Sequence, residues 1–310
     1  MVALLQRACN APRSGFRLAL MRRLSMTPES EGSLLTRERG VRMQRSRGRA
    51  RMGFRRDGDV TRLTEFLQEG CCKIRLPRPE PGMPPDAVLL NTAGGITSGD
   101  DLLYEAEIGR DVVATVTTQA AERVYRAVPG ADPARVANRI RVAAGGHVDW
   151  LPQETILFDR CAIGRSLDVT LEGDATALLL EAYIFGRTAM GESVSTLFLT
   201  DRWRVRREGR LVYADGISMQ GDVTRLLARG AVAGGGIAIA SLVLLASDAA
   251  ARLEAVRARL AACEGEAAAS AFGGILSLRF LAPSGQVLRR DLERVILMLR
   301  ARPMPRVWTC

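Results

Sequence analysis

The sequence is poor in the side chains that most enzymes and metal sites use. Its 310 residues include one histidine, His147, and one lysine, Lys73, and only 5% are aromatic. A Ser–His or Cys–His mechanism would therefore depend on His147 alone, and no nucleophile is singled out to accompany it. Because His147 falls in an apparent strand, we expect a structural or surface histidine. A hydrolase that uses His147 is the least favoured function.

The glycine-rich and cysteine motifs of common enzyme classes are also missing. Residues 216–221 (GISMQG) miss the G-x-S-x-G spacing by one position, and residues 94–99 (GGITSG) lack the Lys-Ser/Thr of a P-loop. None of the six cysteines forms a CxxC pair, which excludes a zinc ribbon or a thioredoxin-like motif. Unpatterned cysteines predict a reducing, cytoplasmic location. We expect no catalytic residue, no tightly bound cofactor and no fixed metal site.

Long apolar runs are absent as well. The longest uncharged segment of interest, residues 231–247, has 17 residues and three consecutive glycines. A membrane-spanning helix needs about 20 apolar residues. The segment therefore predicts a turn at 234–236 followed by a buried strand over 237–245, and no contact with a membrane.

The positive charge is unevenly distributed. The net charge is +10, but residues 1–50 contain eleven arginines and three glutamates, so the rest of the chain is nearly neutral. The rest of the chain offers no basic groove interleaved with aromatic residues, which argues against nucleic-acid binding. We expect residues 1–47 to be an Arg-rich, disordered extension and residues 48–310 to form a single domain.

Strand patterns dominate the middle of the chain. Residues 167–172 and 202–206 alternate between apolar and polar side chains, and residues 111–118 and 136–142 are rich in β-branched residues. Such alternation indicates one buried and one solvated face, which favours antiparallel sheets over a doubly wound parallel sheet.

Helical periodicity is confined to the later part of the chain. One helix is expected after Ser247 or Asp248 as its N-cap, because Leu253, Val256 and Leu260 then form an apolar stripe. A second is expected after Asp291, where the stripe consists of Leu292, Val295, Ile296 and Leu299. A shorter helix is expected over 221–228. The residues alone thus predict one mostly-β domain with a few helices towards its C-terminal part.

Five carboxylates lie inside or beside apolar, strand-like runs, and they are the candidate ligands for a divalent cation. They are Glu122, Glu154, Asp159, Glu181 and Glu192. Each one alone is better explained by a solvated strand face or by an ion pair, such as Glu122 with Arg123 or Arg126. Together they leave a weakly coordinating internal path open as an alternative.

Several long motifs occur in an order that resembles the urease accessory protein family UreD, called UreH in some organisms. They are residues 89–100 (LLNTAGGITSGD), 118–126 (TQAAERVYR), 150–159 (WLPQETILFD), 181–192 (EAYIFGRTAMGE) and 305–308 (PRVW). The residues that carry the resemblance are Asn91, Thr92, Gly94, Gly95, Gln119, Glu122, Arg123, Tyr125, Pro152, Gln153, Gly186, Arg187 and Gly191. It spans residue 48 to the C-terminus, whereas residues 1–47 have no counterpart. Ser98 and Asp101 stand where many members have glycine and a basic residue.

This resemblance implies both a fold and a role. The fold would be mostly β, with stacked antiparallel or mixed strands that resemble a short β-helix and a few helices. The protein would act without catalysis, together with UreF and the GTPase UreG, on apo-urease. Nickel would pass through an internal polar channel in transit, and a homodimer within the accessory complex is compatible with the family. A self-sufficient metallochaperone that binds nickel tightly stays open as an alternative.

Overall fold

The computed structural model describes residues 44–187, 191 and 193–309. The chain divides into two units, Met1–Gln44 and Arg45–Cys310, and every strand and helix described below belongs to the second unit. The expected disordered extension falls almost entirely outside the described residues and stays a prediction. Strand β1 begins at Arg47, the last residue of that expected extension.

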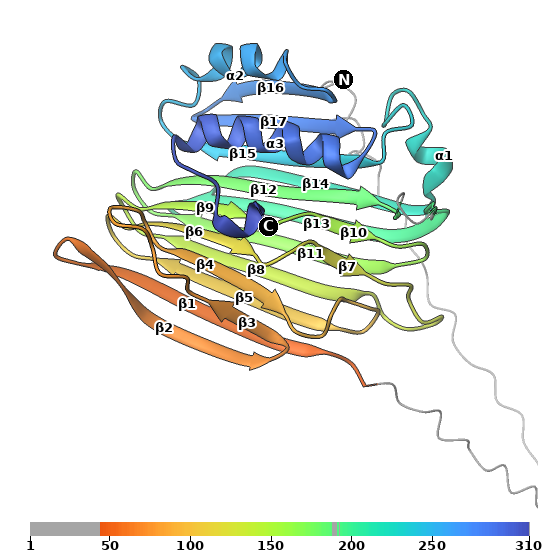
Figure 1. Cartoon of the computed structure of the whole chain (residues 1–310), viewed down its shortest axis with the longest axis horizontal. Helices are drawn as coiled ribbons and strands as arrows, with labels where there is room; N and C mark the ends of the chain where they lie inside the picture. Colours follow the sequence, from red (N-terminus) through yellow and green to blue (C-terminus); the bar gives the residue numbers. More distant parts are fainter. Residues whose placement is uncertain (1–43, 188–190, 192, 310) are drawn as a thin grey trace, which may run out of the picture. The chain divides into compact units, whose positions relative to one another are not determined.

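The second unit is built from two β-sheets that face each other (Figure 1). The seven-stranded sheet contains, in spatial order, β14 (Arg210–Asp222), β13 (Thr196–Arg207), β11 (Ala162–Leu171), β8 (Ala134–Val142), β5 (Asp101–Ile108), β1 (Arg47–Asp57) and β2 (Val60–Gly70). The main path of the ten-stranded sheet contains β16 (Glu266–Phe272), β17 (Ile275–Ala282), β15 (Ala238–Leu245), β12 (Thr176–Phe185), β9 (His147–Leu151), β6 (Val113–Thr118), β4 (Asp86–Asn91) and β3 (Cys72–Arg75). Two short strands, β7 (Glu122–Val124) and β10 (Thr155–Leu157), complete it by pairing beside β12.

The chain winds back and forth between the sheets as in a short β-helix. Strands β5, β8, β11 and β13 pair in parallel in one sheet, and β4, β6, β9 and β12 pair in parallel in the other. Antiparallel pairs occur towards the edges, for example β1 with β2 and β13 with β14. The mostly-β, mixed fold is confirmed, but the preference for antiparallel strands was wrong for the centre of each sheet. Alternation reports which face is buried and does not encode strand direction.

The alternating residues place the main core between the two sheets. On β13, Trp203 and Val205 are buried while Arg202 and Arg204 are exposed, as the pattern predicts. Equivalent inward positions supply Ile140 and Leu167 from the seven-stranded sheet, and the ten-stranded sheet contributes its own apolar face to the same cluster. The outer face of the seven-stranded sheet is consequently left to polar and charged side chains.

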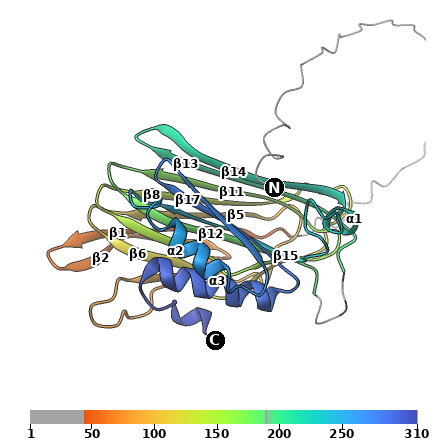
Figure 2. The same cartoon turned by 90° about the horizontal axis from the view of Figure 1, so that it is seen from above.

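The helices lie towards the C-terminal part of the chain, as expected. They are α1 (Val223–Leu227), α2 (Leu253–Leu260) and α3 (Gly285–Arg300), followed by a 3-10 turn at Arg306–Trp308. Apolar residues of α2 and α3 form a second core against β12, β15 and β17. Figure 2 shows both helices on the opposite side of the molecule from β13 and β14.

Two expected helix starts were wrong. Helix α3 begins six residues before Asp291, because the Ser284 side chain accepts a hydrogen bond from the Val287 amide and caps it. Asp291 is instead buried within the helix, where it accepts hydrogen bonds from the amides of Glu264 and Gly265. The N-cap of α2 is Arg252, after a turn that contains Asp248.

The apolar segment 231–247 forms a turn and a strand. Strand β15 covers Ala238–Leu245 and is buried along almost its whole length, which confirms the prediction. Among the residues that the structure describes, no helix is long and apolar enough to cross a membrane.

Candidate functional site

Four of the motif stretches, 89–100, 118–126, 150–159 and 181–192, come together at one end of the ten-stranded sheet. Strand β10 pairs in parallel with both β7 and β12, so residues 122–124, 155–157 and 183–185 lie side by side. The Ile96 amide donates to the carbonyl oxygen of Arg123 at 2.7 Å, and the Glu122 amide donates to that of Glu154 at 2.9 Å. Segments that are distant in the sequence therefore form one continuous hydrogen-bonded unit.

The glycine motif is explained by the close approach of Tyr125. Gly95 has φ of +147°, and a Cβ atom there would lie 2.2 Å from the Tyr125 ring. The Tyr125 hydroxyl donates to the Gly94 carbonyl at 2.9 Å, and the Asn91 amide group donates to the Gly95 carbonyl at 3.2 Å. Only glycine satisfies both the backbone conformation and the contact at position 95.

This unit covers a cavity of about 270 Å³ between the two sheets. Among its lining residues are the motif residues Asn91, Gly94, Gln119, Glu122, Arg123, Pro152 and Gln153, together with Tyr104, Asn138, Trp150, Thr155 and Arg165. These polar side chains share the lining with apolar ones, among them Leu89, Ile96, Leu102 and Val136, because the cavity lies beside the main apolar core. We call this space the polar cavity.

Glu122 is the carboxylate that lines the polar cavity directly. It accepts hydrogen bonds from the Asn91 side chain at 3.2 Å and from the Arg123 amide at 3.0 Å. Burial raises the pKa of Glu122, and these two hydrogen bonds offset only part of that shift. Glu122 is thus held where proton binding is favoured more than at an ordinary surface carboxylate.

Arg165 connects the polar cavity to two deeper carboxylates. Its guanidinium lies 2.7 Å from Glu181, and its backbone is opposite that of Asp201 on the neighbouring strand. Glu181 also accepts from Trp150 Nε1 at 3.3 Å, while Asp201 accepts from the Tyr183 hydroxyl at 2.9 Å.

Burial raises the pKa values of both deep carboxylates, Glu181 and Asp201. The positive charge of Arg165 opposes that shift at each of them.

Two hydrogen-bond donors in this region lack partners. Asn138 Nδ2 and Arg165 Nε are fully buried within the described residues and make no hydrogen bond, and both residues line the polar cavity. Unpaired buried donors are costly, so the cavity is a place where water or another oxygen-bearing species satisfies them.

The polar cavity is lined by one carboxylate, Glu122, and by several side-chain amides. No group of three histidine, cysteine or carboxylate side chains gathers anywhere in the described part of the chain. Carboxylate and amide oxygens bind divalent cations more weakly than histidine and cysteine clusters bind nickel. Arg165 places its own positive charge beside Glu181 in the interior.

Glu154, a second candidate ligand, has a different position. Its carboxylate lies 2.9 Å from the guanidinium of Arg289 on α3, and burial raises its pKa more than that charge lowers it. Arg289 also donates to Gln153 at 3.0 Å and stacks over the ring of Trp308 at 4.8 Å. These contacts join the third motif to the closing motif at 305–308.

Asp159 and Glu192 are not brought into the polar cavity. Asp159 accepts hydrogen bonds from the amides of Ser195 and Thr196 at 2.8 and 3.2 Å, which positions the loop before β13. Glu192 lies outside the described residues. Of the four candidate carboxylates that the structure describes, Glu122 alone lines the cavity, and Glu181 lies one side chain deeper.

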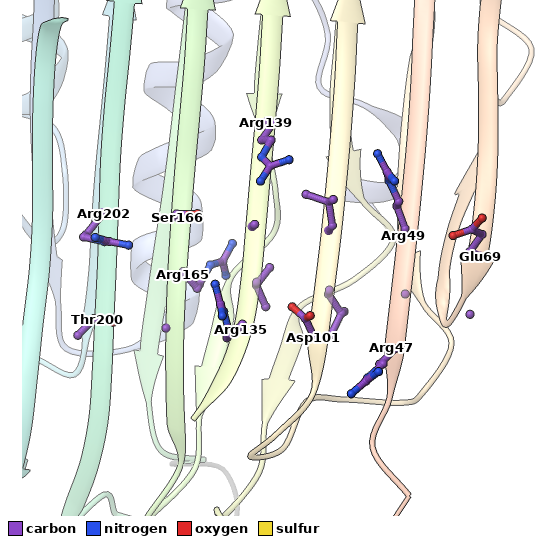
Figure 3. Close-up of a pocket in the computed structure, with 17 residues that line it drawn as sticks. Arg47, Arg49, Glu69, Asp101, Arg135, Arg139, Arg165, Ser166, Thr200 and Arg202 are labelled. Carbon is purple, nitrogen blue, oxygen red and sulfur yellow. The ribbon is translucent and has the colours of Figure 1, made fainter. Parts of the chain in front are cut away.

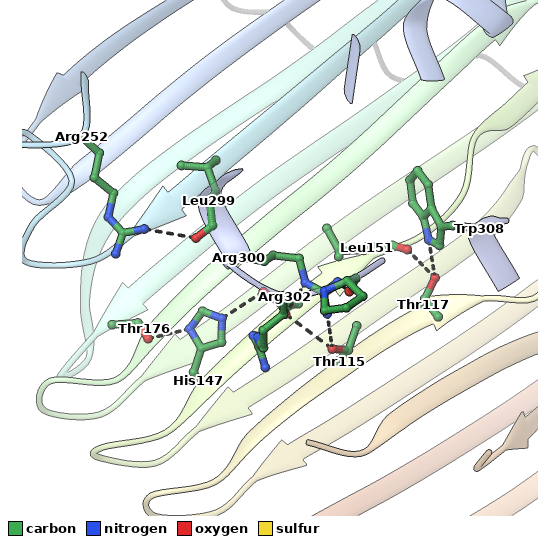
Figure 4. A network of polar contacts seen from close by, with 12 residues as sticks. Thr115, Thr117, His147, Leu151, Thr176, Arg252, Leu299, Arg300, Arg302 and Trp308 are labelled. Carbon is green, nitrogen blue, oxygen red and sulfur yellow. Dashed lines mark hydrogen bonds and ion pairs between the residues drawn. The ribbon is translucent and has the colours of Figure 1, made fainter. Parts of the chain in front are cut away.

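His147 belongs to a separate polar network (Figure 4). Its ring nitrogens lie 2.7 Å from the Thr176 hydroxyl and 2.9 Å from Asp149. Asp149 is fully buried and also accepts hydrogen bonds from Arg300 and Arg302, each at 2.8 Å. The network therefore fastens the end of α3 and the following turn to β6 and β9.

Three interior polar residues were missed by sequence reasoning. Asn138, Arg165 and Asp201 each occupy an inward position on three neighbouring strands, β8, β11 and β13. A signal exists in the sequence, because each is in phase with buried apolar residues of its own strand. Ile163 and Leu167, for example, flank Arg165 on the same face.

These features define a class of protein: a mixed β-helix-like body with a polar cavity beneath the motif segments. A protein-family model described as UreD urease accessory protein matches residues 46–309. Proteins called urease accessory protein UreD in Xanthobacter autotrophicus and Sinorhizobium medicae are each 46% identical to the chain, over 88% and 86% of it and 92% and 96% of their own lengths. The one in Azorhizobium caulinodans is 42% identical over 86% of this chain and 97% of its own.

The chain therefore belongs to the UreD urease accessory protein family. Membership implies a role in urease maturation, and the resemblance stated from the motifs is confirmed.

Proposed function

We propose that the protein is a non-enzymatic scaffold and nickel conduit for urease maturation in the cytoplasm. Together with UreF and the GTPase UreG, it would help insert nickel into apo-urease. Nickel is its cargo and is not a resident cofactor. The single observation that carries the proposal is the polar cavity, which the family's own motif residues line with Glu122 at its wall.

The chemistry of the cavity supports transfer. A conduit needs ligands that hold a divalent ion long enough to guide it and then release it. Glu122 presents its carboxylate oxygens at the cavity wall, where Asn91 donates a hydrogen bond to one of them, and Glu181 lies behind Arg165. Oxygen ligands exchange more readily with nickel than a closed set of thiolates and imidazoles would.

The first test is genetic. Deleting the gene in a urease-positive host should abolish or strongly lower urease activity and the nickel content of the purified urease. Normal activity with full nickel loading would overturn the proposed function. Re-expression of the wild-type chain serves as the control for effects on neighbouring genes.

The second test separates transit from storage. Equilibrium dialysis of the isolated protein against nickel should show weak, non-stoichiometric binding. Tight stoichiometric binding would instead support the metallochaperone alternative, in which the protein acts by itself.

A further inference from the structure

The outer face of the seven-stranded sheet carries a second hollow of about 690 Å³, whose lining shares Leu102, Val136 and Arg165 with the polar cavity. Figure 3 shows arginines from four strands around it: Arg47 and Arg49 on β1, Arg135 and Arg139 on β8, Arg165 on β11 and Arg202 on β13. We call it the arginine groove. The surface is hollow there because the outward positions at its centre, on β8 and β11, hold the small residues Ala137, Gly164 and Ser166.

Three of the six arginines have no partner. Arg47, Arg135 and Arg202 are exposed and make no ion pair or side-chain hydrogen bond with any described residue. Of the other three, Arg49 and Arg139 share the carboxylate of Glu105 at 2.7 and 3.4 Å, and the buried Arg165 pairs with Glu181 at 2.7 Å. Only Glu69 and Asp101 add negative charge to the lining, so the groove carries an uncompensated positive charge.

Strand register fixes the spacing of the unpaired arginines. Arg47 and Arg135 are both opposite Asp101, so two strand spacings separate them. Arg202 is opposite Ser166 on β11, which places it two strands beyond β8. With strands about 4.8 Å apart, successive arginines are about 10 Å apart along the groove. An extended segment in the polyproline II conformation has three residues per turn and rises about 3.1 Å per residue, so carboxylates at every third residue would lie on one face and match this spacing.

We propose that the arginine groove docks an extended acidic segment of a partner protein in urease maturation. This inference rests on the proposed function for the identity of the assembly. Arginine forks bind carboxylates in two-point geometry. A nucleic acid fits less well, because Glu69 and Asp101 would face its phosphates and no exposed aromatic side chain lines the groove for base stacking.

The direct test measures binding of a fluorescent peptide with glutamate at every third residue to the full chain at low ionic strength. The double variant Arg135→Glu/Arg202→Glu should weaken binding about tenfold or more, since two of the three contacts become repulsive. The matched control is Arg141→Glu/Arg204→Glu, which reverses two unpaired, exposed arginines on the same face outside the groove. The control variant should bind the peptide nearly as the wild type does.

Two further probes locate the specificity. A peptide of the same composition with its glutamates adjacent should bind more weakly than the spaced peptide. The second probe is an oligothymidylate of equal charge. If it bound the wild type more tightly than the spaced peptide and lost binding in the groove variant, the assignment to an acidic protein segment would be overturned. Equal effects of the groove and control variants on peptide binding would overturn the groove itself.

The same variants are then expressed with the urease genes. Urease activation should fall in the groove variant and persist in the control variant. If the groove variant loses peptide binding but activates urease normally, the groove does not bind a partner in urease maturation. If it binds the peptide normally but fails to activate urease, the ligand of the groove is not an acidic segment. If deletion of the whole gene leaves urease active, the proposed function is wrong. The peptide-binding measurement still shows whether the arginine groove binds an acidic segment.

Discussion

Arg165 and Glu181 form an ion pair of 2.7 Å that joins the two sheets through the interior of the protein. Both side chains are buried, and Thr155 and Trp150 bond to the same pair. Such a pair gives little net stability, but breaking it leaves a buried charge without its counterion. The pair therefore places a buried positive charge and its counterion at the back of the polar cavity.

Removing one member of this pair should be costly. Glu181→Gln is expected to lower the free energy of unfolding by about 3 kcal/mol, because Arg165 stays buried and charged. The double variant Arg165→Met/Glu181→Leu should lose less than the sum of the single changes. Urea denaturation of the single and double variants measures this coupling. Additive losses would show that the two side chains do not act as a pair.

The Asp149 network predicts a dependence of stability on pH. Burial alone would raise the pKa of Asp149, but the hydrogen bond from His147 and the charges of Arg300 and Arg302 outweigh it, so its pKa lies below the usual range. A lowered folded-state pKa contributes stability that is present above the unfolded-state pKa and is lost as pH falls through the folded-state value.

Asp149→Asn removes that contribution. At neutral pH it should cost about 3 kcal/mol or more, since Arg300 and Arg302 lose their buried counterion. The difference from wild type should shrink as the pH falls below the ordinary range of aspartate. Unfolding midpoints across the acid range provide the measurement. A constant difference at every pH would contradict the assignment of the lowered pKa.

Gly95 and its neighbour Gly94 provide a matched pair of substitutions. Gly95→Ala should destabilise the protein by more than about 1 kcal/mol, because it combines an unfavourable φ with a collision against Tyr125. Gly94→Ala has an unfavourable φ but open space around the added methyl group, so its cost should be smaller. Thermal unfolding compares the two, and equal losses would mean that the Tyr125 contact is unimportant.

The basic N-terminal segment should be dispensable for urease activation. The described contacts begin with the Ser46 amide, which donates to Asp100 at 2.7 Å, so removing residues 1–42 leaves them intact. Urease activity in cells that express the truncated chain should equal that of the full-length chain. A loss of partner binding would contradict the prediction of a disordered extension without a role.

Sequence reasoning predicted the layers of the fold better than their connectivity. The alternation of Trp203 and Val205 with Arg202 and Arg204 correctly assigned the two faces of β13. It said nothing about parallel pairing, because a strand alternates in the same way whichever direction its neighbours run. That winding became an expectation only through the family resemblance.

The candidate site was predictable only in part. Glu122 and Glu181 stood out because they interrupt apolar runs, and they lie at and behind the polar cavity. Glu154 showed the same sequence signal but pairs with Arg289 on α3, a helix distant in the chain. Local sequence cannot report such a partner. Arg165 escaped notice because surface arginines are abundant on the neighbouring strands and its inward phase is visible only once the strand begins at Ala162.

The most direct test of the account is the nickel content of urease matured with Glu122→Gln. This substitution keeps the size of the side chain and its hydrogen bond from the Arg123 amide. It removes the one carboxylate that lines the polar cavity among the candidates that the structure describes. Glu107→Gln, an exposed glutamate on the outer face of β5, is the matched control. We expect Glu122→Gln to assemble with its partners but to yield urease with several-fold less nickel, and Glu107→Gln to behave as wild type. Full nickel loading with Glu122→Gln would contradict the conduit.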